Sequence, residues 1–249
     1  MAPGIASPLA STAIPKPSTE KQISARPRLF HHSLVTKDFD ALRFHAAASL
    51  QLQFGQKYTA AAAKSDDLLI ASPYNEPGHL LDLKTLDTPE QLLSKALTIL
   101  KPVREDYATA PYTEALNWQD VFDFLRELSQ AEGYQWTRQR FYVVAFRSKL
   151  LPDIDSDRLY ELDARSHQEA TASGGLLRYW FGASDENRQN LATCLWRNRT
   201  DARLGGTGPW HQQARAAARE MYEKIEFTTL SLVIGEDGNW EFGEWTDEE

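Results

Sequence analysis

His211 is the residue best placed to do chemistry in this sequence, because it opens a predicted helix that begins near residue 210. Residues three or four apart share a helix face, so Ala214, Ala218 and Tyr222 are expected beside it, directed at a sheet. The helix dipole favours a neutral imidazole at this end, which can act as a base or hydrogen-bond a ligand carbonyl. The alternative is a structural histidine that caps the preceding glycine-rich loop.

Aromatic residues on two predicted strands could wall a cavity for a small hydrophobic molecule. Trp196 alternates with Cys194 on one face of its strand, while Tyr179 and Trp180 take opposite faces of another strand. Such residues often serve simply as core, so both interpretations stay open. The other candidate substrate-binding residues are Arg178, Arg197, Trp210 and Tyr222.

Several arginines lie on predicted strands amid apolar residues, namely Arg147, Arg178 and Arg197. A buried guanidinium needs a partner. That partner could be a carboxylate or enolate of a ligand, a carboxylate of a second subunit, or one of the same chain, which we favour. The candidates within the chain are Asp157, Asp163 and Glu169.

Patterns that bind metals or nucleotides are missing from the sequence. Residues 205–209 (Gly-Gly-Thr-Gly-Pro) precede a helix, but neither a Walker nor a Rossmann pattern accompanies them. We interpret them as a flexible lid or a dimer loop. No cysteine or histidine cluster has the spacing of metal ligands, and Cys194 lies mid-strand. We therefore predict no metal and no cofactor.

Composition narrows the class of protein and its partners. The chain has 249 residues, 42% of them hydrophobic, and a net charge of -8. This charge argues against nucleic acid or an anionic membrane as the main partner. No apolar run is long enough to cross a membrane, and a single cysteine fits a reducing compartment such as the cytoplasm. Residues 1–28 are predicted to form a disordered tail, with a mitochondrial presequence as the alternative.

Residues 29–135 are predicted to form a mainly helical region. Apolar spacing predicts a helix over 38–63, and Asp67–Ser72 is a candidate buried strand. A second helix is expected from Thr88, its N-cap, to about Leu100. A third starts near Asn117 and ends at Gly133.

Residues 136–249 are predicted to form an α+β domain in the ferredoxin-like order β-α-β-β-α-β. Its expected sheet is antiparallel with both helices on one face, so either a second copy of the chain or the N-terminal helical layer must cover the other face. An edge strand is expected after the last of these elements. The predicted segments are 141–150, 157–173, 176–182, 190–197, 210–224, 227–234 and 240–245.

Two resemblances add to this interpretation. The string Trp196-Arg197-x-x-x-Asp201-Ala202, followed by His211 and Tyr222, resembles the dimeric α/β-barrel proteins of the antibiotic-biosynthesis monooxygenase type. The blocks 179–182, 190–197 and 208–211 also resemble an uncharacterised fungal protein family that is sometimes found beside secondary-metabolite genes. The barrel resemblance implies a cavity between sheet and helices, flanked by Trp196 and His211, and a homodimer. The haem-degrading branch has an Asn on its first strand, and residues 141–148 contain none.

These observations lead to two hypotheses of different classes. The first is a cofactor-independent enzyme of the monooxygenase, cyclase or isomerase type, which acts on a small hydrophobic metabolite with His211 as acid/base. The second is a non-catalytic protein that binds a small molecule or forms a dimeric interaction partner. Haem binding is a weaker third hypothesis.

Overall fold

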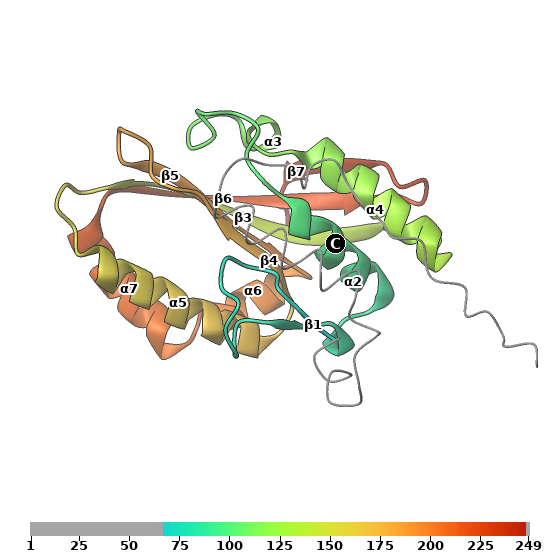
Figure 1. Cartoon of the computed structure of the whole chain (residues 1–249), viewed down its shortest axis with the longest axis horizontal. Helices are drawn as coiled ribbons and strands as arrows, with labels where there is room; N and C mark the ends of the chain where they lie inside the picture. Colours follow the sequence, from blue (N-terminus) through green and yellow to red (C-terminus); the bar gives the residue numbers. More distant parts are fainter. Residues whose placement is uncertain (1–66, 248–249) are drawn as a thin grey trace, which may run out of the picture.

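The computed structural model describes residues 67–247, with an antiparallel sheet between two helical layers (Figure 1). The predicted tail and the predicted helix over 38–63 lie outside these residues. Within the described part, no helix is both long and apolar enough to cross a membrane. The mixture of helices and antiparallel strands confirms the predicted α+β class.

The large sheet has five strands in the order β4-β5-β3-β6-β7. Strand β3 (Gln139–Leu150) lies at its centre and pairs with β5 (Gln189–Trp196) and β6 (Tyr222–Ile234). Strand β4 (Leu176–Phe181) lies outside β5, and β7 (Trp240–Glu244) lies outside β6. With the helices between them, β3 to β6 have the predicted ferredoxin-like order, and β7 is the predicted added strand.

Helices α5 (Ser156–Ser173), α6 (Arg199–Gly205) and α7 (Pro209–Met221) cover one face of this sheet. The predicted end of α7 is wrong, because the helix stops at Met221 and β6 starts at once. Tyr222 pairs with Leu150 of β3, so the sheet overrides a helical spacing that would have continued for another turn. Tyr222 is therefore a strand residue.

The opposite face carries the N-terminal layer, which contains α2 (Thr88–Ala96), α3 (Tyr112–Ala115) and α4 (Trp118–Glu132). The N-cap of α2 is Asp87 and not the predicted Thr88, because the Asp87 amide donates to the Glu90 side chain at 3.0 Å in a capping box. Gly133 ends α4 with a φ of 67°, as the sequence predicted.

Short elements complete this layer, and one of them is shorter than the sequence predicts. The candidate strand over Asp67–Ser72 is only two residues long in the structure. After Leu69 the chain leaves β2 and runs to β4, where the carbonyl of Ala71 accepts from the amide of Tyr179. The elements are β1 (Leu68–Leu69), β2 (Leu81–Asp82) and the 3-10 helices η3 (Leu83–Thr85) and η4 (Leu97–Ile99).

The largest apolar core of the described residues lies between the sheet and the N-terminal layer. Val143, Leu195 and Leu232 face this layer with 0% exposure, and Phe122 of α4 belongs to the same core with 2% exposure. Of the two covers that the sequence left open for this face, the chain's own N-terminal layer is the one observed. The predicted domain boundary near residue 135 lies between α4 and β3. The division into two domains stays a prediction.

Candidate functional site

Asp163 of α5 is the centre of a polar cluster on the face of the sheet opposite the N-terminal layer. The hydroxyls of Tyr74 and Tyr179 each donate to one oxygen of its carboxylate, both at 2.5 Å. Burial raises the pKa of Asp163, while these two hydrogen bonds and the charge of His211 oppose that rise. A carboxyl group with such a raised pKa is a stronger base than an ordinary aspartate and a candidate for acid/base chemistry.

Two buried histidines continue the cluster along α5. The Nδ1 atoms of His79 and His167 are 2.8 Å apart, so one ring must donate to the other, and the rings stack at 5.0 Å. Burial lowers the pKa of both imidazoles, and the neighbouring His79 and His211 help lower that of His167 to about 3. Both rings are therefore neutral at physiological pH.

The segment between β1 and β2 holds Tyr74 and His79 in this position. The amide of Tyr179 in β4 donates to the carbonyl of Ala71 at 2.9 Å, so this segment lies against the outer edge of β4. The Tyr74 ring then lies 4.7 Å from the His79 ring. The segment thus joins the N-terminal layer to the cluster.

Glu169 and His211 form a second acid/base unit, which links α5 to the start of α7. The Glu169 carboxylate accepts from the amides of Trp210 and His211, at 2.7 and 3.1 Å, and lies 3.0 Å from Nδ1 of His211. Desolvation alone would raise the pKa of Glu169, but these hydrogen bonds together outweigh it and lower that pKa. A side chain at Gly208 would collide with this carboxylate, because an added Cβ would lie 2.3 Å from Oε2. Glycine at 208 therefore leaves room for the dyad.

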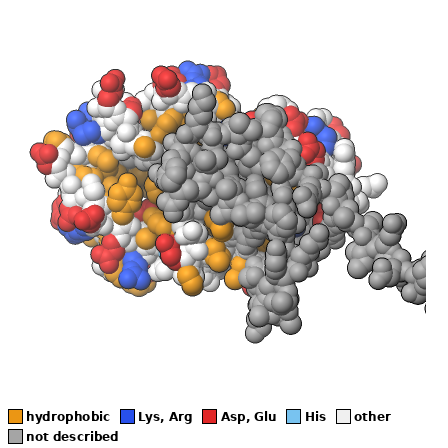
Figure 2. All heavy atoms as spheres, in the orientation of Figure 1, with side chains coloured by type: hydrophobic (Ala, Val, Ile, Leu, Met, Phe, Trp, Pro, Cys, Tyr) orange, Lys and Arg blue, Asp and Glu red, His pale blue; other side chains and the backbone are white. Residues whose placement is uncertain are grey.

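The face of the sheet beside these units is not completely covered by the helices. Val144, Phe146 and Cys194 point from the sheet toward α5 and α7, yet all three remain partly accessible. Figure 2 shows hydrophobic side chains gathered over the part of the molecule that contains these helices and the nearby strands. Burial raises the pKa of the Cys194 thiol to about 12, so the thiol stays protonated.

The structure brings five of the eight predicted site residues to this side of the sheet. Tyr179 and Trp196 face the helices, and Trp196 packs with Tyr142 and Ala170. Trp210 and Tyr222 pack around Leu162 in a neighbouring cluster, together with Met221 of α7. With His211 these residues line the same layer, although only Tyr179 contacts Asp163.

The remaining three predicted residues lie elsewhere. Arg178 is fully buried and directed at the N-terminal layer, against which Trp180 also packs. Arg197 forms an ion pair with Asp201 at 2.7 Å at the end of β5. The predicted residues therefore do not form one site, and their binding roles stay predictions.

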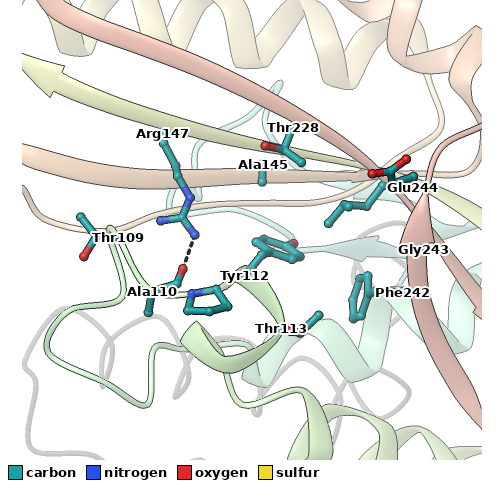
Figure 3. A pocket seen from close by; sticks show the side chains of 12 residues that line it. Thr109, Ala110, Tyr112, Thr113, Ala145, Arg147, Thr228, Phe242, Gly243 and Glu244 are labelled. Carbon is teal, nitrogen blue, oxygen red and sulfur yellow. Dashed lines mark hydrogen bonds between the residues drawn. The ribbon is translucent and has the colours of Figure 1, made fainter.

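Arg147 lines a separate cleft of about 530 Å³ on the other face of the sheet, beside β7 and the segment before α3 (Figure 3). Its guanidinium donates to the carbonyls of Ala108 and Ala110. The expected carboxylate partner is therefore wrong for Arg147, whereas Arg197 does pair with a carboxylate of the same chain, although with Asp201 and not with one of the three candidates. Asp163 binds tyrosines, Glu169 binds the start of α7, and Arg147 uses main-chain carbonyls.

A family model described as PB2B2.08-like matches residues 70–244. The chain belongs to this family. The UPF0643 protein PB2B2.08 of Schizosaccharomyces pombe is 40% identical over 176 residues, which are 66% of this chain and 79% of that protein. The match begins at the segment that carries Tyr74 and His79, so both acid/base units lie within the family's span.

Some solved structures with a likeness to the chain are of the antibiotic-biosynthesis monooxygenase type. A candidate antibiotic biosynthesis monooxygenase from Nitrosomonas europaea has a TM-score of 0.32 and 14% identity, covering 35% of this chain and 94% of its own. A mutant of SnoaB, a cofactor-independent oxygenase from Streptomyces nogalater, has a TM-score of 0.32 and 13% identity, covering 44% and 98%. The resemblance to an uncharacterised fungal family, stated from the motifs, is confirmed by the family match. The likeness to the two solved structures covers less than half of this chain.

Several residues of the site were missed in the sequence. Tyr74 and His79 lie in a turn-rich segment without periodicity, where nothing local indicates a distant contact. Asp163 and His167 did carry a signal, because they are four residues apart on the helix face that also holds Leu162. Because ionisable residues are unusual on a helix face that packs against a sheet, this pattern could have identified Asp163 and His167 as candidate site residues. No group of three or more metal-ligating side chains occurs within residues 67–247.

Proposed function

We propose that this protein is a cofactor-independent enzyme of the isomerase type that binds a small hydrophobic ketone or enol between the sheet and helices α5 and α7. The Glu169–His211 dyad and the Asp163 carboxyl carry out the proton transfers. The partly accessible wall around Cys194, Val144 and Phe146 supports the choice of an apolar ligand.

The arrangement of Glu169 and His211 is the observation that carries the proposal. Because Glu169 is an acceptor, Nδ1 of His211 must hold the proton that bridges the 3.0 Å between them. In the uncharged form of this ring the lone pair is on Nε2, where it can take a proton from a substrate. A carboxylate that fixes the tautomer of a catalytic histidine in this way also stabilises the imidazolium that forms.

Asp163 and Tyr179 supply the second proton step. Tyr179 donates to Asp163, so a substrate hydroxyl can donate in turn to the phenol oxygen. When an enol becomes a ketone, the imidazolium of His211 gives a proton to carbon, and the enol proton passes to Tyr179 as the phenol proton moves to Asp163. One proton enters the substrate and one leaves it, and Tyr179 is neutral before and after. The raised pKa of Asp163 favours acceptance of this proton.

Solvent-hydrogen exchange tests the proposal even when the substrate is one unidentified metabolite among many. The full chain is incubated in D₂O with a small-molecule extract of its source cells, and the extract is analysed by mass spectrometry. Reversible tautomerisation replaces a C–H hydrogen by deuterium, so a metabolite gains one mass unit. We expect His211→Ala and Asp163→Asn to abolish this exchange. Glu161→Gln is the matched control, because it changes an exposed carboxyl on the same helix.

Native mass spectrometry of the same samples separates catalysis from binding. A metabolite that binds the unaltered protein and never gains deuterium would refute the proton-transfer step and favour a non-catalytic binding protein. Exchange that persists in both variants would place the chemistry elsewhere in the molecule.

A further inference from the structure

One edge of the large sheet has a stretch without a neighbouring strand among the described residues. Strand β6 pairs with β3 from Tyr222 to Ile234, but β7 pairs with β6 only from Leu230 onward. Within residues 67–247, the outer edge of residues 222–229 therefore carries no partner strand beyond the contact from the Trp245 amide to the Thr229 carbonyl at 3.4 Å. We call this stretch the open edge. The opposite edge of the sheet differs, since Ala71 covers β4.

The main-chain groups on the open edge can be assigned from this contact. The Thr229 carbonyl points outward, and outward groups recur at every second residue of an antiparallel strand. Ile225 and Phe227 therefore present their amides and carbonyls away from β3, up to the irregularity in pairing at Glu223. With Thr229 they form successive outward donors and acceptors, which are a template for another strand.

The side chains of the open edge select a partner. Phe227 is 68% exposed and Ile225 is partly accessible on the same face, while Lys224 and Glu226 are exposed on the other face. Sheet edges that stay unpaired usually carry charged side chains, which oppose association. An exposed phenylalanine on this edge favours contact with a partner instead. Alternating charges of both signs instead allow the strand to pair with itself.

Charge complementarity determines the register of such a pair. In an antiparallel pair centred on Ile225, Lys224 of each copy lies opposite Glu226 of the other, which gives two attractive contacts. Phe227 then flanks the central pair of isoleucines. A register centred on Glu226 would place two carboxylates opposite each other, which is unfavourable.

We propose that two copies of this chain associate through the open edge, antiparallel and with Ile225 opposite Ile225, to form one continuous ten-stranded sheet from the five strands of each. The interface uses a sheet edge because the sheet face is already covered by the N-terminal layer. The site between the sheet and helices α5 and α7 remains within each copy, so the association is independent of the proposed reaction.

Sedimentation of the full chain with charge reversals tests both the interface and its register. Lys224→Glu and Glu226→Lys should each weaken self-association about tenfold or more, because each turns two attractive contacts into repulsive ones. A mixture of the two variants should form a heterodimer, since every cross-strand charge pair is then attractive. The variant with both reversals should recover the affinity of the unaltered chain.

A further substitution tests the main-chain contacts. Phe227→Pro removes an outward amide that β3 does not use, so we expect loss of association with an unchanged circular dichroism spectrum. A monomeric unaltered chain, or single reversals that associate as strongly as the unaltered chain, would overturn the proposal. Association that is lost in the single reversals and absent from their mixture would overturn the register centred on Ile225.

Discussion

The two faces of the large sheet are built from the same strands but have opposite properties. Toward the N-terminal layer, Val143 and Leu195 are completely buried in a continuous apolar core. Toward α5 and α7, the adjacent Val144 and Cys194 remain partly accessible beside Asp163. Because successive strand residues point to opposite faces, this alternation lets one face provide stability and the other provide the polar groups of a site.

The largest expected effect comes from the closed face. Phe122 of α4 is 2% exposed and stacks on Trp240 of β7 with ring centroids 4.4 Å apart. We expect Phe122→Ala to lower the free energy of unfolding by about 3–5 kcal/mol, because it leaves a cavity in a packed core. Val144→Ala on the other face should cost only about 1 kcal/mol. Urea unfolding followed by tryptophan fluorescence measures both, and equal losses would contradict the difference between the faces.

The buried histidines make stability depend on pH. The pKa of His167 falls from 6.5 to about 3 on folding, so the folded chain resists a proton that the unfolded chain accepts. The free energy of unfolding should therefore decrease as pH falls below 6.5, by up to about 1.4 kcal/mol per pH unit. Urea unfolding between about pH 7 and pH 5 tests this, with His167→Gln expected to flatten the slope. An equally steep slope in that variant would show that a group other than His167 takes up the proton on unfolding.

At Asp163, a substitution should raise the stability of the fold while it removes the proposed activity. Burial raises its pKa in the folded state, so stability is greatest below the unfolded pKa and is lost as pH rises through the folded pKa. Asp163→Asn removes the charge and keeps groups that can hydrogen-bond both tyrosines. We expect it to raise the free energy of unfolding by about 1 kcal/mol at neutral pH while it abolishes the proposed exchange. A large loss of stability would instead make Asp163 a structural residue.

The smallest effect is expected on the outer surface of the helical layer. Arg158 of α5 and Glu220 of α7 form an exposed ion pair at 2.8 Å. Arg158→Ala should change the free energy of unfolding by less than about 0.5 kcal/mol, since exposed ion pairs are well screened. A larger change in urea unfolding would show that the contact between these helices depends on their surface charges as well as on apolar packing.

The elements with strong local patterns were predicted well from the sequence. Helix α4 has an apolar stripe and a terminal glycine, and β5 is a short, mostly apolar run from Leu191 to Trp196, so the local sequence was enough to predict both elements. The end of α7 failed because the residues after Met221 continue a helical spacing. Only pairing with β3, which is distant in sequence, identifies Tyr222 as a strand residue.

The site was less predictable because its groups meet through tertiary contacts. His211 was identified from its place at a helix start, but its partner Glu169 lies 42 residues earlier and was assigned to an arginine. Tyr74 lies 89 residues before Asp163, in a segment whose conformation depends on β4. The partner of Arg147 could not be predicted, because its guanidinium binds main-chain carbonyls, which every residue carries.

The contact between Glu169 and Gly208 also restricts how this family can evolve. An acid at 169 serves two neighbours at once, the start of α7 and His211, and it occupies the space that any side chain at 208 would need. These three positions should therefore change together among relatives. A relative with a larger residue at 208 should have lost the acid at 169, and the histidine at 211 would then be released from selection.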